Sequence, residues 1–283
     1  MTKRILITGA TGRVGSSIAR QMPASCDVRV GVRNIERAQT AFDKPLTYVL
    51  FDFEDPTTYA DALDGVTDMF LMLPPVGTQP VFDVIDAAVE RGVSHVVLLS
   101  ILRADKLRVV PHRRIEEYLE QAPLTYTFLR AGYFMQNLSS VHKADIAEHH
   151  EIYIPAGKGK FLFVDVRDVA AVGVQALTES GHENTAYELT GREARTFGEV
   201  AQVFSDVLER RIDYHSPNPI AFVRRMMRDY DHALSFALFM LVEYTVTRIG
   251  LLGEEPSPEL EHLLGRPPTT IAQFVDDYRA VWA

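Results

Sequence analysis

Three glycines recur at intervals of three residues near the start of the chain. Gly9, Gly12 and Gly15 follow the apolar run 5–7 and precede a segment with the apolar spacing of a helix. In such a strand–turn–helix the first glycine permits a tight turn, the second lets an anion approach the backbone, and the third allows close packing. Free N–H groups at the helix start attract phosphate. The turn therefore predicts the pyrophosphate site of a dinucleotide, with a purely packing role as the alternative. The predicted site also includes Thr11, Arg13 and Val14.

The second strand is expected at 28–32, and the residues that follow it select the type of dinucleotide. An NAD site usually carries Asp or Glu there to bind the ribose 2′-hydroxyl. Here Arg33 and Asn34 follow the strand, and the first carboxylate is that of Glu36. A 2′-phosphate requires a cation with forked donors, which Arg33 supplies. The sequence therefore favours NADP(H) over NAD(H), and a solvated loop arginine is the alternative interpretation of Arg33.

Two further loops complete the predicted cofactor site. Asp52 and Phe53 follow the third strand, where such folds contact adenine. Leu73 and Pro74 follow the fourth strand, where the chain passes the ribose and nicotinamide. Both assignments rest on the rule that ligands bind at the carboxyl ends of parallel strands. Proline is equally common as turn punctuation, which is the alternative for Pro74.

Alternating strands and helices must position these loops. Apolar strands separated by helical segments indicate a parallel sheet covered on both faces, the doubly wound Rossmann α/β arrangement. The expected strands are 5–8, 28–32, 46–51, 69–73, 96–100 and 126–130. The expected helices between them are 14–22, 35–41, 55–65, 81–90 and 114–121.

The second half of the chain is typical of a smaller, mostly helical lid over the substrate. Its expected elements are strands at 161–164 and 187–190, helices starting at 165, 196, 257 and 270, and a long apolar helical stretch over 220–252. We expect an NADP(H)-binding domain over 1–153 and a lid over 154–283, with segments 154–190 returning to the sheet. The apolar stripe of Phe236, Phe239, Met240 and Tyr244 is typical of core. A substrate cavity or an oligomer interface are the alternatives for this stripe.

Composition excludes several classes of function. Of the 283 residues 47% are hydrophobic, and 38 acidic against 29 basic side chains give a net charge of −9. This charge disfavours nucleic acid and anionic membranes as partners. The single cysteine, Cys26, and an N-terminus unlike a signal peptide favour the cytoplasm. The most apolar stretch, 233–242, is about half a bilayer span. His149 and His150 lack the partner spacing of a metal site, so no metal is expected.

Several segments together resemble the NmrA-like branch of the atypical short-chain dehydrogenases/reductases, along nearly the whole chain. The matching segments are 5–12, 32–34, 52–55, 96–100, 126–130, 134–138, 164–170 and 264–268. The resemblance implies a Rossmann fold that binds NADP(H). It also implies one of the family's roles, which include reduction of quinones, triphenylmethane dyes, imines and aryl-propanoids, and regulation by cofactor sensing without catalysis.

The resemblance also points to residues for proton transfer. Typical short-chain dehydrogenases use Tyr-x-x-x-Lys, and no tyrosine here has a lysine four residues later. Many relatives instead carry a lysine shortly before a helix reading Ile-Glu-Glu-Tyr-Leu, which is 115–119 in this chain. Aligning the helices places His112 at the lysine position. His112 is a candidate acid because histidine titrates near neutral pH, and ordering the turn or touching the ribose is the alternative.

Two other side chains follow strands that the family shares. Ser100 matches the serine after the family's fifth strand, where it either orients a substrate carbonyl and contacts the cofactor or is a buried strand-end hydroxyl. Tyr133 follows the sixth strand and is expected to form a pocket wall, with proton donation as a second role.

The missing tyrosine–lysine pair limits the chemistry that we expect. Quinones, activated enones and iminium or dye cations accept a hydride with little proton transfer, whereas a simple ketone needs a positioned acid. The expected function is therefore NADPH-dependent hydride transfer to a planar, apolar small molecule, and a homodimer is one expected assembly. The alternative is a non-catalytic, NADP(H)-sensing regulatory protein.

Overall fold

A computed structural model describes residues 3–108, 110–230, 232–250 and 253–282. Contacts divide them into two compact units that interleave along the chain. Unit 1 comprises the described residues of Met1–Ala131, Val166–Leu189 and Glu259–Arg266, and unit 2 those of Gly132–Asp165, Thr190–Pro258 and Pro267–Ala283. The functional division expected at residue 153 stays a prediction.

A parallel sheet forms the centre of unit 1. Its described strands are β1 (Arg4–Ile7), β2 (Asp27–Val32), β3 (Thr47–Leu50), β4 (Asp68–Met72), β5 (His95–Ile101), β6 (Thr125–Ala131) and β10 (Thr185–Leu189). They are ordered β3-β2-β1-β4-β5-β6-β10, and every neighbouring pair is parallel. The chain winds outward from β1 in one direction and from β4 in the other. The predicted doubly wound sheet is confirmed.

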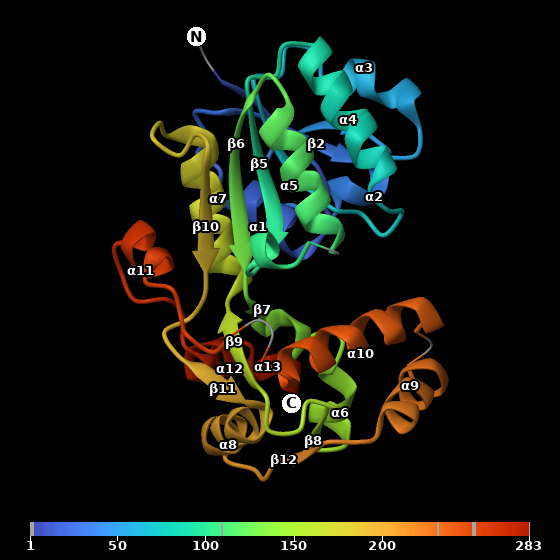
Figure 1. Ribbon diagram of the computed structural model, residues 1–283, viewed down its shortest axis with the longest axis vertical. Coiled ribbons are helices and arrows are strands. Elements are labelled where there is room, and N and C mark those ends of the chain that lie inside the picture. The colour runs from blue at the N-terminus through green and yellow to red at the C-terminus, as the bar shows by residue number, and fades with distance from the viewer. Residues whose placement is uncertain (1–2, 109, 231, 251–252, 283) are drawn as a thin grey trace. The chain divides into compact units, whose positions relative to one another are not determined.

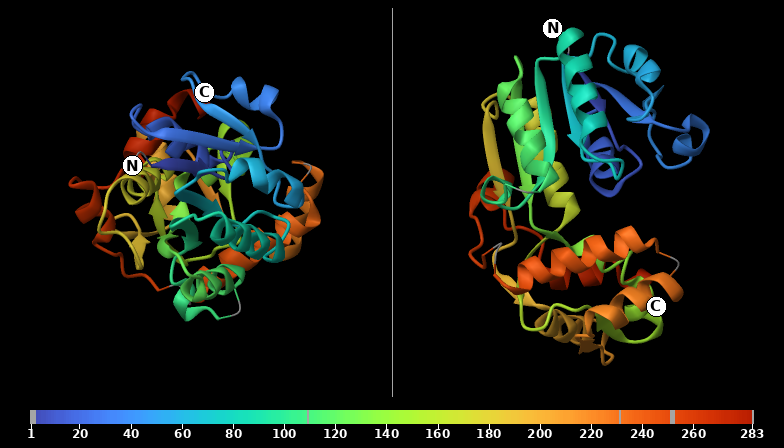
Figure 2. Two further views of the ribbon diagram at one scale, coloured as in Figure 1. Left: turned by 90° about the horizontal axis from the view of Figure 1, so that it is seen from above. Right: turned by 45° about the vertical axis from the view of Figure 1, so that its right-hand side comes forward.

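Helices cover both faces of this sheet, as a parallel sheet requires. They are α1 (Arg13–Gln21), α2 (Ile35–Gln39), α3 (Tyr59–Ala62), α4 (Gln79–Glu90), α5 (Pro111–Gln121), α7 (Val166–Thr178) and α11 (Glu259–Leu264). Two short 3₁₀ turns are η1 (Pro56–Thr58) and η2 (Ala104–Lys106). The helices α1 and α7 pack together on one face, and α4 and α5 pack together on the other (Figure 1 and Figure 2).

One expected helix of unit 1 is shorter than the sequence suggests. Asp55 caps its first turn by accepting from the N–H of Thr57 at 3.1 Å. The predicted helix over 55–65 is nevertheless wrong in extent, because η1 occupies its first turn and α3 ends at Ala62. Gly65 then takes a φ of 66°, in the left-handed region that glycine favours.

Unit 2 combines short strands with helices. Its strands are β7 (Tyr133–Phe134), β8 (Glu151–Tyr153), β9 (Lys160–Val164), β11 (Ala194–Thr196) and β12 (Asp213–His215). Its helices are η3 (Met135–Asn137), α6 (Lys143–Glu148), α8 (Phe197–Leu208), α9 (Pro219–Arg228), α10 (Leu234–Arg248), α12 (Ile271–Asp277) and α13 (Arg279–Trp282). The helices predicted to start at 196 and 270 both form, and a capping box at Thr196 and another at Thr270 fix their starts.

Three expectations for the second half need correction. The strand at 161–164 forms as β9, but it pairs with β11 and β7 in a small separate sheet, so only α7 and β10 of segments 154–190 belong with the Rossmann sheet. Within the helical stretch expected over 220–252 the described residues form two helices, α9 and α10, rather than one, and residues 231, 251 and 252 lie outside the described residues. The expected core stripe is split, because Met240 and Tyr244 are buried whereas Phe239 is 60% exposed.

No described helix combines the length and the apolar character needed to cross a bilayer. The stretch 233–242 lies instead within helix α10 and the residue before it, and α10 buries Ala237, Met240 and Tyr244 on one side.

Candidate functional site

The predicted cofactor residues lie at one edge of the unit 1 sheet. Because β1 is flanked by β2 and β4 in a parallel arrangement, the loops after these strands emerge side by side at their carboxyl ends. The chain leaves β1 and β4 in opposite directions, so this edge contains the topological switch point. In open α/β sheets the switch point forms the crevice where ligands bind.

The glycine turn after β1 is too tight for side chains at two of its three glycines. Gly9 has a φ of 58°, and a Cβ there would lie 2.9 Å from Cγ of Met72 at the end of β4. A Cβ on Gly15 would lie 2.4 Å from the carbonyl oxygen of Gly9. The N–H of Gly12 donates to that same oxygen at 2.8 Å. The turn therefore requires glycine to close and to pack α1 against the sheet.

The third glycine, Gly12, is at the start of α1 and is exposed. Its backbone is extended, with φ −80° and ψ 173°, and among the described residues no side chain caps the helix there. A helix start without a side-chain cap leaves N–H groups for an outside acceptor. Thr11 and Arg13 are exposed beside it, whereas Val14 is buried. These features fit a pyrophosphate, which needs backbone donors and an approach free of side chains.

Arg33 directly follows β2 at the same edge and is exposed. Its side chain makes no hydrogen bond or ion pair within the described ranges 3–108, 110–230, 232–250 and 253–282. The next residue, Asn34, caps α2 by accepting from the N–H of Arg37 at 2.8 Å. The guanidinium of Arg33 is therefore uncommitted, as a 2′-phosphate ligand would need.

The loops after β3 and β4 are ordered by internal contacts. Asp52 accepts from the N–H of Glu54 at 3.0 Å, and the carbonyl of Phe53 accepts from the hydroxyl of Tyr59 at 2.6 Å. Leu73 is half-buried and Pro74 is buried. The adenine and nicotinamide contacts assigned to these loops stay predictions.

A buried ionic network joins the end of β5 to α5 and β6. Its central residue, Glu116, was not predicted from the sequence. The Ser100 hydroxyl donates to Glu116 at 2.7 Å, and Arg130 donates to both carboxylate oxygens, at 3.0 and 2.8 Å. Arg113 adds a third donor at 3.2 Å. Glu116 is fully buried. The available signal was a carboxylate between the apolar positions Ile115 and Leu119 of the helix, together with an arginine in an apolar strand.

The network occupies the hydrogen-bond donor of Ser100. With its proton directed at Glu116 and only 2% of the residue exposed, Ser100 is anchored in the sheet. Burial alone would lower the pKa of Arg130, but hydrogen bonding to Glu116 and the nearby carboxylates raise it above the usual value. Arg130 thus stays charged and holds Glu116 in place. Contact of Ser100 with a cofactor or substrate stays a prediction.

His112 lies in the first turn of α5, next to this network. Its Nδ1 is buried and, in the described part of the chain, has no hydrogen-bond partner. Burial lowers the pKa of His112 to about 4, outweighing the opposite effect of Glu116. The imidazole is therefore neutral at pH 7. The folded pKa lies below the unfolded value of 6.5, so the stability that burial contributes is complete above pH 6.5 and declines as the pH falls toward 4.

Tyr133 lies in the aromatic core of unit 2. Its hydroxyl is 3.1 Å from that of Tyr244, which in turn is 2.7 Å from Nε2 of His142. Burial raises the pKa of Tyr244 well above its usual value. The rings that pack edge-on against Tyr133 are Phe161, Phe163 and Phe197. Proton donation by Tyr133 stays a prediction.

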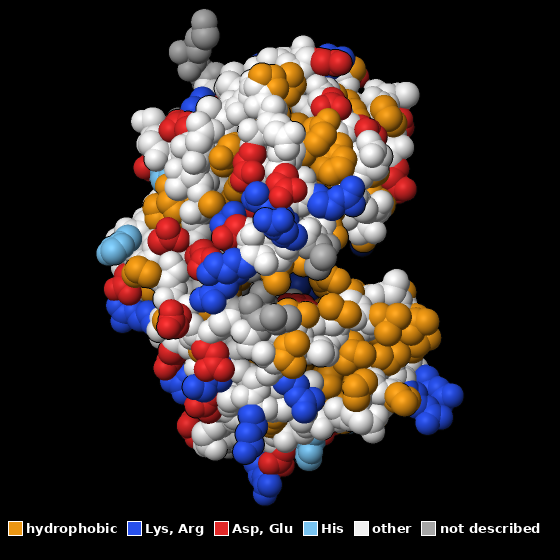
Figure 3. Space-filling view, viewed as in Figure 1, with side chains coloured by type: hydrophobic (Ala, Val, Ile, Leu, Met, Phe, Trp, Pro, Cys, Tyr) orange, Lys and Arg blue, Asp and Glu red, His pale blue; other side chains and the backbone are white. Residues whose placement is uncertain are grey.

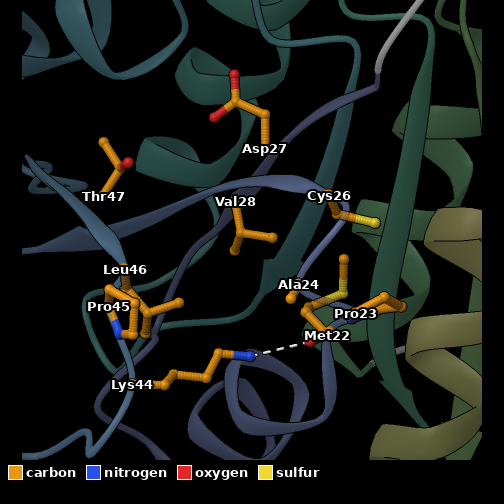
Figure 4. Close-up of a pocket in the computed structure, with 10 residues that line it drawn as sticks. All are labelled: Met22, Pro23, Ala24, Cys26, Asp27, Val28, Lys44, Pro45, Leu46 and Thr47. Carbon is orange, nitrogen blue, oxygen red and sulfur yellow. Dashed lines mark hydrogen bonds between the residues drawn. The ribbon is translucent and has the colours of Figure 1, made fainter.

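The hollow drawn in Figure 4 lies elsewhere on unit 1. Asp27 and Thr47, which line it, begin β2 and β3, so it belongs to the amino-terminal edge of the sheet. Lys44 donates to the carbonyl of Met22 there at 2.9 Å, and burial lowers its pKa. The predicted cofactor residues are at the other edge. Among the described residues, no three His, Cys, Asp or Glu side chains gather as a metal site requires.

Comparison with known proteins agrees with this geometry. The sequence model of the NmrA-like family matches residues 1–274. An NAD(P)H azoreductase of Xenophilus azovorans is 32% identical, over 98% of this chain and 99% of its own. The structure of an Escherichia coli NADPH-dependent quinone oxidoreductase complexed with NADPH has a TM-score of 0.83 and 28% identity, covering 97% of this chain and 99% of its own. Citrobacter sp. triphenylmethane reductase complexed with NADP(H) has a TM-score of 0.83 and 25% identity over the same shares.

Proposed function

Because the chain belongs to the NmrA-like family, we propose that it is an NADPH-dependent oxidoreductase that reduces a conjugated, apolar small molecule of the quinone, enone or imine type. The observation that carries the proposal is the shape of the turn after β1. Side chains are excluded at Gly9 and Gly15, and the start of α1 is left without a side-chain cap at Gly12. A pyrophosphate needs such an open helix start, where backbone N–H groups can reach it.

The residues of this edge have separate tasks in the proposal. Backbone N–H groups at Gly12 and beyond hold the pyrophosphate, with Thr11 and Arg13 beside it. Arg33 binds the 2′-phosphate, Asp52 and Phe53 contact adenine, and Leu73 and Pro74 border the ribose and nicotinamide. Bound NADPH supplies a hydride from its nicotinamide. The single cysteine suits a reducing compartment such as the cytoplasm.

We expect Arg33→Ala to weaken NADPH binding by about 1.5 to 3 kcal/mol, the contribution of hydrogen bonds to a charged group. NADH lacks the 2′-phosphate, so its binding should change little. Isothermal titration calorimetry with both cofactors measures the difference. Arg91→Ala is the matched control, because Arg91 is exposed at the end of α4, near the opposite edge of the sheet. Equal losses for NADPH and NADH would remove Arg33 from the phosphate site.

The lowered pKa of His112 favours acceptors that need no proton from the protein. At pH 7 the imidazole of His112 is neutral, and Ser100 already donates its proton to Glu116. A quinone or a dye cation accepts a hydride without a strong acid, whereas an enone gains from protonation of its oxygen. Quinone reduction should therefore be the less demanding reaction for this chain.

His112 as proton donor has a distinctive pH signature. With a pKa of about 4, its protonated fraction rises about tenfold for each pH unit between 7 and 5. If His112 protonates the acceptor, enone reduction should rise in step, and His112→Ala should remove the rise and slow the reaction about 100-fold. Quinone reduction should be little affected by pH or substitution. An unchanged pH profile in His112→Ala would show that His112 only orders the start of α5.

A panel of acceptors tests the function itself. Oxidation of NADPH should be followed with quinones, enones, imines and azo dyes, because each class accepts a hydride at a conjugated centre. We expect turnover with at least the quinones. Binding of NADPH without turnover of any class would instead favour a cofactor-sensing regulatory protein.

A further inference from the structure

A set of polar residues is buried at the amino-terminal edge of the unit 1 sheet. Figure 3 shows acidic and basic side chains on the surface over α4 and α5, whereas Asp68, His95 and Thr127 are at most 5% exposed. Asp68 begins β4, His95 begins β5 and Thr127 lies in β6, so the three residues follow one another across neighbouring strands. The proposed reaction uses none of them.

These residues connect to the loop that leads into β10. Nε2 of His95 is 3.0 Å from the hydroxyl of Thr127, and that hydroxyl donates to the carbonyl of His182 at 2.7 Å. On the other side of the ring, Nδ1 of His95 is 3.5 Å from Oδ1 of Asp68. We call these four residues the His95 network, and residues 179–184, between α7 and β10, the β10 loop. The network thus holds the β10 loop to β5 and β6.

Asp68 brings a negative charge to the network. Burial alone would raise the pKa of Asp68, but hydrogen bonds from His95, Thr67 and Lys3 lower it below its usual value. Lys3 donates to Oδ1 of Asp68 at 3.0 Å, and the Thr67 hydroxyl donates to Oδ2 at 2.7 Å. An ionised carboxylate therefore faces Nδ1 of His95.

Further ionisable groups lie around His95. Lys3 is paired with Asp68, Glu183 of the β10 loop is exposed, and the ring of His182 is 3.0 Å from a tyrosine hydroxyl of β10. Lys3, Asp68, His95 and Glu183 also line a hollow of about 270 Å³. The network can therefore exchange protons with solvent while the sheet stays intact.

The directions of the hydrogen bonds place a proton on Nε2 of His95. A hydroxyl has a single hydrogen, and a carbonyl oxygen only accepts. Because the Thr127 hydroxyl gives its hydrogen to the carbonyl of His182, the Thr127 oxygen must accept from the ring of His95. Nε2 is therefore the donor in that contact.

A single proton cannot serve both sides of the His95 ring. With the proton on Nε2, the lone pair of Nδ1 faces the charged carboxylate of Asp68. With the proton on Nδ1, Nε2 becomes an acceptor, so the Thr127 hydroxyl must turn to it and leave the His182 carbonyl without this donor. Either neutral form leaves a buried polar group poorly paired, which costs free energy. Protons on both nitrogens satisfy every member of the network.

We propose that His95 carries a proton on both ring nitrogens in the folded protein and acts as a pH-sensitive latch for the β10 loop. As the pH rises, the proton on Nε2 leaves to solvent. The proton on Nδ1 stays, because a hydrogen bond to a charged acceptor is the stronger one. The Thr127 hydroxyl then turns to Nε2 and releases the carbonyl of His182. This proposal does not depend on the proposed reaction.

Nitrogen NMR of the histidine rings tests the charge state directly. At pH 7 both ring nitrogens of His95 should carry a proton, whereas an exposed histidine is mostly neutral. His95→Gln identifies the signals by their loss. The amide signal of Glu183, whose nitrogen is bonded to the carbonyl carbon of His182, should shift between pH 7 and pH 9 as the carbonyl loses its donor. A His95 ring with one proton at pH 7 overturns the proposal.

Two substitutions of Thr127 separate the latch from other effects of pH. Thr127→Val keeps the shape but removes the hydroxyl, so the Glu183 signal should no longer shift. Thr127→Ser keeps the hydroxyl and is the matched control. Above pH 7 the folded wild type holds a proton that the unfolded chain has released, so its stability should fall as the pH rises. Between pH 7 and pH 9 the unfolding constant from urea titrations should rise about tenfold more for wild type and Thr127→Ser than for Thr127→Val.

Circular dichroism shows whether the variants are folded. If Thr127→Val does not fold, Asp68→Asn takes its place: without the carboxylate one proton is enough, so the His95 ring should carry one at pH 7. A Glu183 signal that shifts equally in wild type and Thr127→Val overturns the latch. Equal losses of stability in Thr127→Ser and Thr127→Val also overturn it.

Discussion

Gly12→Val is expected to raise the dissociation constant of NADPH at least about 100-fold while the protein stays folded. The backbone at Gly12 has φ −80° and ψ 173°, which valine adopts readily. A Cβ there would lie 3.1 Å from the carbonyl oxygen of Gly9, a tight contact that a small adjustment relieves. The branched side chain would then cover the start of α1, where the pyrophosphate must approach the backbone. Calorimetry measures the binding, and thermal unfolding measures the fold.

Gly198→Val provides the matched control. Gly198 is also in the first turn of a helix, α8 of unit 2, and an added Cβ would make only ordinary contacts there. This variant should bind NADPH as the wild type does. If Gly12→Val melts normally and binds NADPH at wild-type strength, the start of α1 is not the pyrophosphate site.

Glu116→Ala is expected to lower the free energy of unfolding by about 3 to 5 kcal/mol, the cost of breaking a buried ion pair by removing one partner. The substitution leaves the buried hydroxyl of Ser100 without its acceptor, and among the described residues Arg130 keeps its ion pair with Asp105, at 3.1 Å. Arg113 is less affected because it also pairs with Glu117 at 3.0 Å. Urea unfolding followed by circular dichroism measures the change.

Glu117→Ala is the control for Glu116→Ala. Glu117 is the next residue of the same helix, but its side chain is 48% exposed and forms an exposed ion pair with Arg113. Exposed ion pairs of this kind contribute little, so we expect a change within about 0.5 kcal/mol. If Glu116→Ala lowers the free energy of unfolding no more than Glu117→Ala does, the buried Glu116 network stabilises the protein no more than an exposed ion pair.

The Rossmann unit was largely predictable because its signals are local. Each strand of a sheet covered on both faces is an apolar run of its own, and each helix between strands has its own apolar period. The geometry of the glycine turn was also predictable from its residues, because a side chain at Gly9 or Gly15 would collide with neighbouring atoms. The family assignment is confirmed by the match over residues 1–274.

Unit 2 and the electrostatics of the candidate site were less predictable because they depend on distant contacts. The short strand β9 pairs with β7 and β11, and no local pattern specifies such partners. The pKa of His112 is set by burial beneath neighbouring elements, which its own sequence does not reveal. Glu116 is committed to Arg130 from the neighbouring strand, a pairing that only the fold brings about.

Deuterated NADPH tests whether this protein transfers a hydride directly to its acceptor. Nucleotide-free protein should be mixed with NADPH that carries deuterium at one or the other C4 position, with no added flavin or metal, and with a quinone or, to trace the deuterium onto carbon, an activated enone as acceptor. We expect oxidation of NADPH, a slower rate for only one of the two deuterated forms, and deuterium bound to carbon in the enone product of that form. Tight binding of NADPH without oxidation, by the enone or by any quinone, imine or azo dye, would contradict the assignment as a reductase.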